Sequence, residues 1–161
     1  MLHLLFRRNQ FYMCSLKLVK EGIVALYDWP TDVLADHWDE QAVCSKILEK
    51  KDSLLCDILM DQEVFAGVSN VIRNEVLYSA RVHPLSTVGA IRRHKLTQLI
   101  KEVRKYSFEY LEWKRNCAIK SQCKVYRQDQ CPRHEIPLHI KSLGKSKRNI
   151  YYCEKCQMLY I

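Results

Sequence analysis

Residues 61–75 read DQEVFAGVSNVIRNE, a glycine-bearing turn that runs directly into a helix. The first ten residues interrupt a helical pattern with Gly67 and several small polar residues, and VIRNEVLYSA resumes the pattern at once. A turn of this kind exposes free backbone N–H groups at a helix N-terminus, where the helix dipole favours negative charge. Asn70 lies where the helix begins, so its amide could cap the helix or reach a phosphate. Most such turns only connect two helices, so this stretch alone does not establish a binding site.

Helical patterns flank the turn on both sides. Asp39 is expected to cap a helix over DEQAVCSKILEKK. The apolar positions of that helix share one side: Ala42, Cys44, Ile47 and Leu48. Asp52 is expected to cap a short buried helix, SLLCDILM. The helix after the turn should span about residues 71–81 and stop at His83 and Pro84, because proline disfavours helix in the residue before it.

The longest helix should run over about residues 92–115, after the loop PLSTVGA. Leu96, Ile100 and Val103 recur there at helical spacing, and basic residues cover the other faces. Four aromatic side chains near its C-terminal end are interpreted as core rather than as a base-stacking platform: Tyr106, Phe108, Tyr110 and Trp113.

Residues 1–34 have a different pattern. MLHLLF, FYMCSLKLV and GIVALYDW are short apolar runs with some alternation, which is typical of β-strands. Three short strands would be marginally stable alone, so they are expected to belong to a larger sheet whose remainder is missing. Pro30 and the acidic segment TDVLAD then connect them to the helical part. No apolar run approaches the roughly 18 residues of a membrane helix, and MLHLLFRRNQ does not resemble a secretory signal.

The net charge of +8 is confined to the C-terminal part of the chain. Residues 1–113 carry 15 basic and 15 acidic side chains, whereas residues 114–161 carry 11 basic and 3 acidic ones. An excess in one short segment indicates a polyanionic partner, and nucleic acid is favoured over an acidic membrane.

The C-terminal segment contains two pairs of potential metal ligands. CPRH at residues 131–134 and CEKC at residues 153–156 each separate a pair by two residues, and 18 residues lie between the pairs. This spacing predicts one closed, structural zinc site, because zinc binds four thiolate or imidazole ligands tetrahedrally. The predicted ligands are Cys131, His134, Cys153 and Cys156, with His139 as a rival fourth ligand of poorer spacing. A metal site explains these cysteines better than disulfides, so an intracellular, reduced protein is expected.

The segment between the two pairs, EIPLHIKSLGKSKRNIYY, predicts a β-hairpin around Gly144. Its tip and second arm are basic and include Lys141, Lys145, Lys147 and Arg148. A metal-braced hairpin can present arginine to a backbone phosphate and so position a duplex.

The order of these features resembles the formamidopyrimidine-DNA glycosylase and endonuclease VIII family. The resemblance covers about residues 35–161 and rests on MDQ-x-VFAG-x-x-N-x-I-x-NE-VL, on R-x-HP after it, and on a two-pair finger that ends in CEKCQ. It implies a mainly α fold with a small β part. A helix–two-turn–helix DNA-binding domain would span residues 35–120 and a C-terminal zinc finger residues 121–161. Residues 1–34 resemble the last strands of the family's N-terminal β-sandwich domain.

The resemblance also implies roles for individual residues. Asn70 matches the turn asparagine that binds a phosphate beside the extruded nucleotide, and Arg148 matches the zinc-finger arginine that grips the neighbouring phosphate. Together they would hold the base out of the stack. Lys145 and Lys147 are expected, from the charge of the hairpin and not from the resemblance, to add contacts to DNA. The four predicted ligands match those of the family's zinc finger. Glu75 matches an acidic residue for which a structural role is expected.

Three positions depart from the family's pattern. The second zinc ligand is commonly cysteine but is His134 here, which zinc accepts equally well. The turn commonly has glycine where this chain has Ser69, so a positive φ there would be mildly strained. The family's nucleophile is the amine of an N-terminal proline followed by a catalytic glutamate, whereas this chain begins Met-Leu-His. No catalytic residue is therefore assigned.

Three hypotheses of function follow from these features. The first is the DNA-gripping part of a bifunctional glycosylase and abasic-site lyase, which would be active only when a proline-led N-terminal domain is supplied. The second is a stand-alone, non-catalytic DNA-binding module, and the third is a zinc-dependent protein-interaction module. A monomer bound to double-stranded DNA with a damaged base or abasic site is expected, with one structural Zn²⁺ and no membrane.

Overall fold

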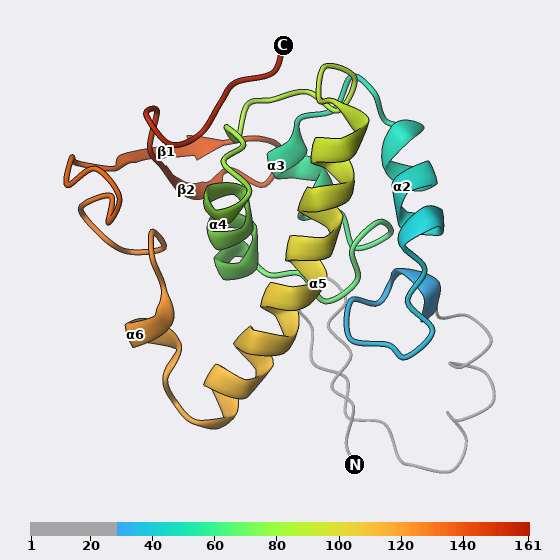
Figure 1. Cartoon of the computed structure of the whole chain (residues 1–161), viewed down its shortest axis with the longest axis horizontal. Coiled ribbons are helices and arrows are strands. Elements are labelled where there is room, and N and C mark those ends of the chain that lie inside the picture. Colours follow the sequence, from blue (N-terminus) through green and yellow to red (C-terminus); the bar gives the residue numbers. More distant parts are fainter. Residues whose placement is uncertain (1–28) are drawn as a thin grey trace.

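The computed structural model describes residues 29–161. A short 3₁₀ helix is followed by five α-helices and a two-stranded hairpin (Figure 1). The elements are η1 (Trp29–Thr31), α2 (Glu40–Leu48), α3 (Leu55–Ile58), α4 (Asn70–Ser79), α5 (Arg93–Arg115), α6 (Ile119–Gln122), β1 (His139–Leu143) and β2 (Arg148–Tyr152). The expected strands lie almost entirely outside the described residues. Trp29, expected to end the third strand, instead begins η1.

The long helix α5 packs between α2 and α4 (Figure 1). The predicted spacing on α5 is confirmed, because Leu96, Ile100 and Val103 are all buried in the main core. The core side of α4 supplies Ile72 and Val76. Helix, turn and helix are therefore held in one apolar cluster, which fixes the position of the α4 N-terminus.

The helix starts follow the sequence in one case and depart from it in another. The Asp39 side chain accepts hydrogen bonds from the backbone N–H groups of Gln41 (2.8 Å) and Ala42 (3.2 Å), so the predicted cap of α2 is confirmed. The prediction that Asp52 caps α3 is wrong. That helix begins at Leu55, whose N–H donates to the backbone oxygen of Ser86 at 2.8 Å, so a distant loop takes the place of a side-chain cap.

The aromatic cluster on α5 is core for three of its four members. Tyr106 is buried, and Tyr110 and Trp113 pack against the core, with the Tyr106 and Trp113 rings in edge contact at 5.2 Å. Phe108 was expected in the core as well, but it is 42% exposed. It lies on the other side of the helix, where its ring contacts the guanidinium of Arg104.

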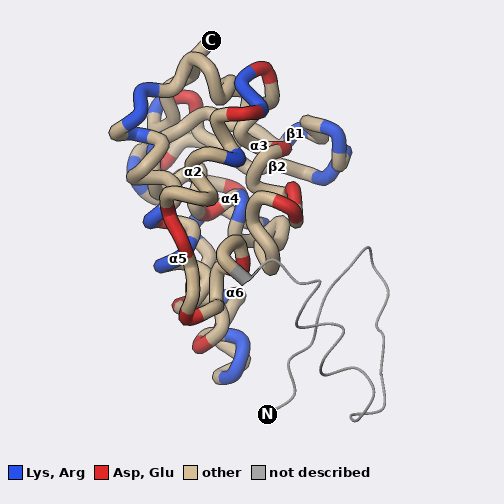
Figure 2. The backbone as a smooth tube through the Cα atoms, turned by 90° about the vertical axis from the view of Figure 1, so that its right-hand side faces the viewer, with Lys and Arg blue, Asp and Glu red and all other residues tan. Residues whose placement is uncertain are grey.

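The predicted β-hairpin is confirmed. The strands pair antiparallel from His139 with Tyr152 to Leu143 with Arg148, and Gly144 begins the connecting loop with φ +72°. Figure 2 shows basic positions gathered at this loop. The inner side of β2 joins the main core through Ile150 and Tyr152. A small second cluster combines Tyr78 of α4 with residues of the C-terminal segment: Val125, Cys131, Leu138, Cys153 and Cys156.

Among the residues that the structure describes, no helix has both the length and the apolar character needed to cross a membrane.

Candidate nucleic-acid interface

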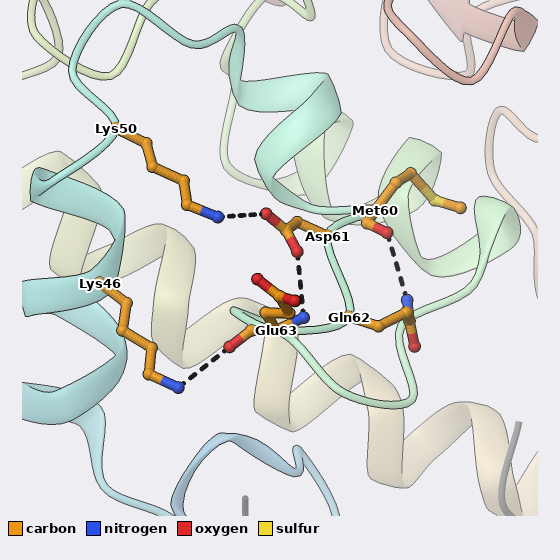
Figure 3. Close-up of polar contacts among 6 residues, drawn as sticks. All are labelled: Lys46, Lys50, Met60, Asp61, Gln62 and Glu63. Carbon is orange, nitrogen blue, oxygen red and sulfur yellow. Dashed lines mark hydrogen bonds and ion pairs between the residues drawn. The ribbon is translucent and has the colours of Figure 1, made fainter. Parts of the chain in front are cut away.

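The loop before α4 is held by polar contacts at its base. Lys50 on the segment after α2 pairs with Asp61 at 2.5 Å, and the Lys46 ammonium donates to the Glu63 backbone oxygen at 3.1 Å (Figure 3). Gln62 spans the loop, because its Oε1 accepts from the Gly67 N–H and its Nε2 donates to the Val68 oxygen, both at 3.1 Å. The loop is thus fixed against α2 before it reaches the helix.

The positive φ of the turn falls on glycine. Gly67 has φ +91°, a conformation that an L side chain would strain. Ser69 has φ −104° and is the N-cap of α4. The expectation of strain at Ser69 is therefore wrong, because the turn does not need a left-handed residue at that position.

Asn70 is the first residue of α4 rather than its cap, which rules out the capping alternative for its side chain. Its Oδ1 accepts from Arg73 Nη2 at 2.5 Å and from Asn74 Nδ2 at 3.2 Å. Its Nδ2 lies 3.4 Å from the backbone oxygen of Asn149, on the second strand of the hairpin. The turn asparagine and the hairpin are therefore neighbours in space.

Arg73 lies beneath this contact and is fully buried. Its Nη1 donates to Ser146 Oγ at 3.1 Å, and its Nη2 lies 3.4 Å from the backbone oxygen of Arg148. Burial lowers the pKa of Arg73, while the nearby Cys56 and Asp57 oppose that change. One guanidinium thus links the α4 N-terminus to the tip and second strand of the hairpin.

Two further polar side chains of α4 contact the C-terminal segment. Asn74 Oδ1 accepts from the Tyr151 N–H at 2.7 Å. Glu75 is 1% exposed, and its carboxylate accepts three backbone N–H groups: those of Lys124 (3.0 Å), Val125 (2.9 Å) and Tyr126 (2.8 Å). These contacts give Glu75 a structural role.

The basic side chains at the hairpin tip face solvent. Lys145, Lys147 and Arg148 are all exposed. The backbone beneath them is fixed, because the Lys145 N–H donates to Asp57 Oδ1 at 2.7 Å. Across residues 29–161 these three cations have no ion-pair partner. On a braced loop beside the turn of Asn70, they form a surface suited to an anionic chain.

The four predicted ligands meet at one point. One possible ligand atom from each of Cys131, His134, Cys153 and Cys156 lies within 4.8 Å of all the others. His134 Nδ1 is 3.2 Å from Cys156 Sγ and 3.9 Å from each of the other two sulfurs. These residues fit a single metal ion. His139 is not in this group, since it begins β1 and faces Glu154 at 3.7 Å.

Burial disfavours thiolates in this cluster without a cation. It raises the pKa of Cys153 to about 11. Burial acts in the same direction on Cys131, but hydrogen bonds outweigh it and lower the pKa of that thiol to about 6. The hydroxyl of Tyr78 on α4 provides one of them, 3.4 Å from Cys131 Sγ. A bound cation would stabilise all three thiolates together.

With this geometry in view, the family can be assigned. Residues 30–116, more than half of the chain, match the formamidopyrimidine-DNA glycosylase H2TH domain. The chain belongs to this family. The helix–two-turn–helix is the segment from α2 through α5, and the hairpin with the Cys/His cluster is the finger of the family's fold.

Within the family, similar proteins include endonuclease 8-like 3 of Mus musculus, with 32% identity over 114 residues that cover 70% of this chain and 19% of that protein. Endonuclease 8-like 2 of Homo sapiens is 28% identical over 152 residues, 91% of this chain and 43% of that protein. The chain therefore spans less than half the length of these two relatives.

Solved structures of glycosylases share the fold. A viral DNA glycosylase superposes with a TM-score of 0.73 at 23% identity, over 86% of this chain and 54% of that one. The formamidopyrimidine-DNA glycosylase of Lactococcus lactis, non-covalently bound to DNA containing an abasic site, gives 0.70 at 18% identity, over 79% and 48%.

Sequence reasoning missed Arg73 and Asn74 as parts of this site. Both are fully buried, although charged and amide side chains are ordinarily read as solvent-facing. The available signal was their spacing, because Asn70, Arg73 and Asn74 are at i, i+3 and i+4 and share one face of a helix. That face could have been predicted to contact a partner segment.

Proposed function

We propose that this chain binds the sugar–phosphate backbone of double-stranded DNA at a damaged base or an abasic site, as the DNA-gripping part of a base-excision repair protein. The observation that carries the proposal is that Arg73 bonds both Asn70 and the Arg148 backbone, so two phosphate-binding candidates lie side by side. The related Lactococcus lactis enzyme, bound to DNA with an abasic site, supports the choice of ligand.

In this proposal Asn70 and Arg148 contact neighbouring phosphates from the turn and from the hairpin. Asn70 would donate from its amide, and Arg148 would donate a charged fork that matches a phosphate. Lys145 and Lys147 would add charge contacts along the backbone, which strengthen binding without reading sequence. The free energy of these contacts would offset part of the cost of extruding a nucleotide from the stack, which is a few kcal/mol.

We propose zinc as the metal of the Cys/His cluster, in a structural role. Tetrahedral zinc with Zn–S bonds of about 2.3 Å separates two sulfurs by roughly 3.8 Å. Cys131 and Cys156 have their sulfurs 3.5 Å apart, which is close to that value. With four protein ligands no position remains for a reactive water, so the ion would brace the hairpin rather than perform chemistry.

The test is binding of a fluorescent duplex that carries a stable abasic-site analogue, followed by anisotropy. Asn70→Ala and Arg148→Ala should each weaken binding by roughly 1–3 kcal/mol, about 5- to 150-fold, because each removes a well-placed or charged hydrogen bond. Binding of the unmodified chain should fall steeply with salt as counterions are released from the duplex.

Lys101→Ala is the matched control for loss of one positive charge. Lys101 is exposed on α5, away from the hairpin, so the variant should bind nearly as well as the unmodified chain. Equal affinity of Asn70→Ala, Arg148→Ala and the unmodified chain for the abasic duplex would refute the proposal.

A further inference from the structure

The carboxamide of Asn70 has two different ends, and one of them suits a phosphate. Phosphate oxygens only accept hydrogen bonds, so the NH₂ end of the amide can bind them and the oxygen end would repel them. A side chain free to rotate by half a turn would present the wrong end part of the time. An asparagine that grips a phosphate therefore needs something to fix its orientation.

Arg73 supplies that constraint. Arginine has donors and no acceptor, so the atom of Asn70 that faces Arg73 Nη2 must be the oxygen. Asn74 Nδ2 donates to the same oxygen and also to the Asn70 backbone oxygen at 2.7 Å. With Oδ1 held inward by two donors, the NH₂ group of Asn70 is left toward the hairpin surface, where it lies near the Asn149 oxygen.

The guanidinium is itself held in place. It is fully buried, and its two other hydrogen bonds are to the hairpin, at Ser146 Oγ and the Arg148 oxygen. Within the described part of the chain its Nε has no hydrogen-bond partner. Because a buried, incompletely paired charge adds little to stability compared with an apolar side chain of similar size, stability alone does not account for arginine here.

We propose that Arg73 is a positioning residue, which fixes the Asn70 carboxamide with its NH₂ group toward the DNA backbone and holds the hairpin arginine at a set distance from it. This inference rests on the proposed DNA-binding function. Arg73 itself is too deeply buried to touch DNA. Its contribution to binding must therefore pass through Asn70 and the hairpin.

The first experiment is a double-mutant cycle on the abasic-analogue duplex, with Arg73→Met, Asn70→Ala and the double variant. Each single change should weaken binding at least about fivefold. The double variant should bind no more than about threefold less tightly than whichever single variant has the lower affinity, because both changes remove the same oriented amide. Arg104→Met is the control for loss of a partly buried arginine, because Arg104 contacts Ala35 and Trp38 and not Asn70 or the hairpin. This control should change affinity for the duplex less than about twofold.

The second variant, Asn70→Asp, is expected to keep the fold. Its carboxylate would still accept from Arg73 and would sit at the start of α4, where the helix dipole favours negative charge. It has no donor for a phosphate. The unfolding temperature should stay close to that of the unmodified chain, because the gain at the helix start is offset by the lost hydrogen bond to the Asn149 oxygen. Affinity for the abasic duplex should fall at least as far as in Asn70→Ala.

The outcomes separate the two proposals. Unchanged affinity in both Asn70→Ala and Arg148→Ala would end the proposed function itself. If Asn70→Ala weakens binding but Arg73→Met has no effect, or if the two losses multiply in the double variant, the positioning role is overturned and the proposed function stands. Asn70→Asp that binds as well as the unmodified chain would also overturn it.

Discussion

Glu75 offers a sharp test of what joins the finger to the helical part of the molecule. Its Oε1 accepts from the Val125 and Tyr126 N–H groups, and its Oε2 accepts from the Lys124 N–H. Glu75→Gln keeps the shape of the side chain and leaves one oxygen to bond two of these donors. Its NH₂ group must then face the third N–H, donor against donor.

The cost follows from these contacts. The variant loses the Lys124 hydrogen bond, and a hydrogen bond to a charged group contributes about 1.5–3 kcal/mol. The other two bonds become weaker, because a neutral amide oxygen replaces the carboxylate and charge-assisted bonds are roughly twice as strong as neutral ones. Removing a buried carboxylate recovers part of this through its desolvation penalty. We expect a net loss of about 2–4 kcal/mol, which lowers the unfolding temperature by roughly 5–15 °C for a chain of this size.

Calorimetry with saturating metal measures the overall loss, and amide hydrogen exchange locates it. Exchange protection should disappear first at residues 124–126. Glu49→Gln is the control, because Glu49 is exposed at the end of α2 and should change stability by less than about 0.5 kcal/mol. A Glu75→Gln variant as stable as this control, with residues 124–126 still protected, would show that the carboxylate does not anchor the segment.

The remaining predictions concern the finger. A chelator should remove exchange protection from residues 121–161 while α2 to α5 keep theirs, because folding of such a segment is coupled to its metal; equal exchange rates with and without chelator would count against a metal site. Tyr78→Phe deletes the hydroxyl beside Cys131 and should weaken metal affinity about 10- to 100-fold in a competition titration, with the helical content unchanged by circular dichroism. Gly144→Ala should destabilise the chain by more than about 1 kcal/mol in urea unfolding, because φ is +72° and the new Cβ would clash with Asp57 Oδ1. An unchanged urea midpoint would contradict this.

Helices α2, α4 and α5, the hairpin and the cluster of potential metal ligands could be predicted from the sequence because each depends on local pattern. The short elements η1 and α6 were not predicted. Spacing on α5 places Leu96, Ile100 and Val103 together whatever the rest of the chain does. The Asp39 cap and the Gly144 turn likewise need only nearby residues. The α3 start could not be found in this way, since its N–H groups are satisfied by a backbone loop about thirty residues further along the chain.

The position of the metal-ligand pairs was predictable, but the way they are held against α4 was not. Sequence spacing shows that Cys131 and Cys156 can share an ion, yet it contains no information about Tyr78, which comes from another element. Phe108 shows the opposite case. The apolar ring of Phe108 predicts a buried position, but the side chain lies on the exposed side of α5. The packing of α5 between α2 and α4 decides which aromatic side chains are covered.

The polar face of α4 follows from the small size of the finger. Residues 121–161 supply few apolar side chains to their own cluster, and three of its members are metal-ligand cysteines. A segment with so little core is expected to need a metal for its stability, and it cannot orient itself by apolar contact alone. Directional hydrogen bonds from Arg73, Asn74 and Glu75 set the orientation of the finger, because each of them can form in only one relative position of hairpin and helix. In the proposed function, two phosphate contacts on separate elements bind well only if the elements keep a fixed spacing. That requirement would account for buried polar groups at this joint despite their desolvation cost.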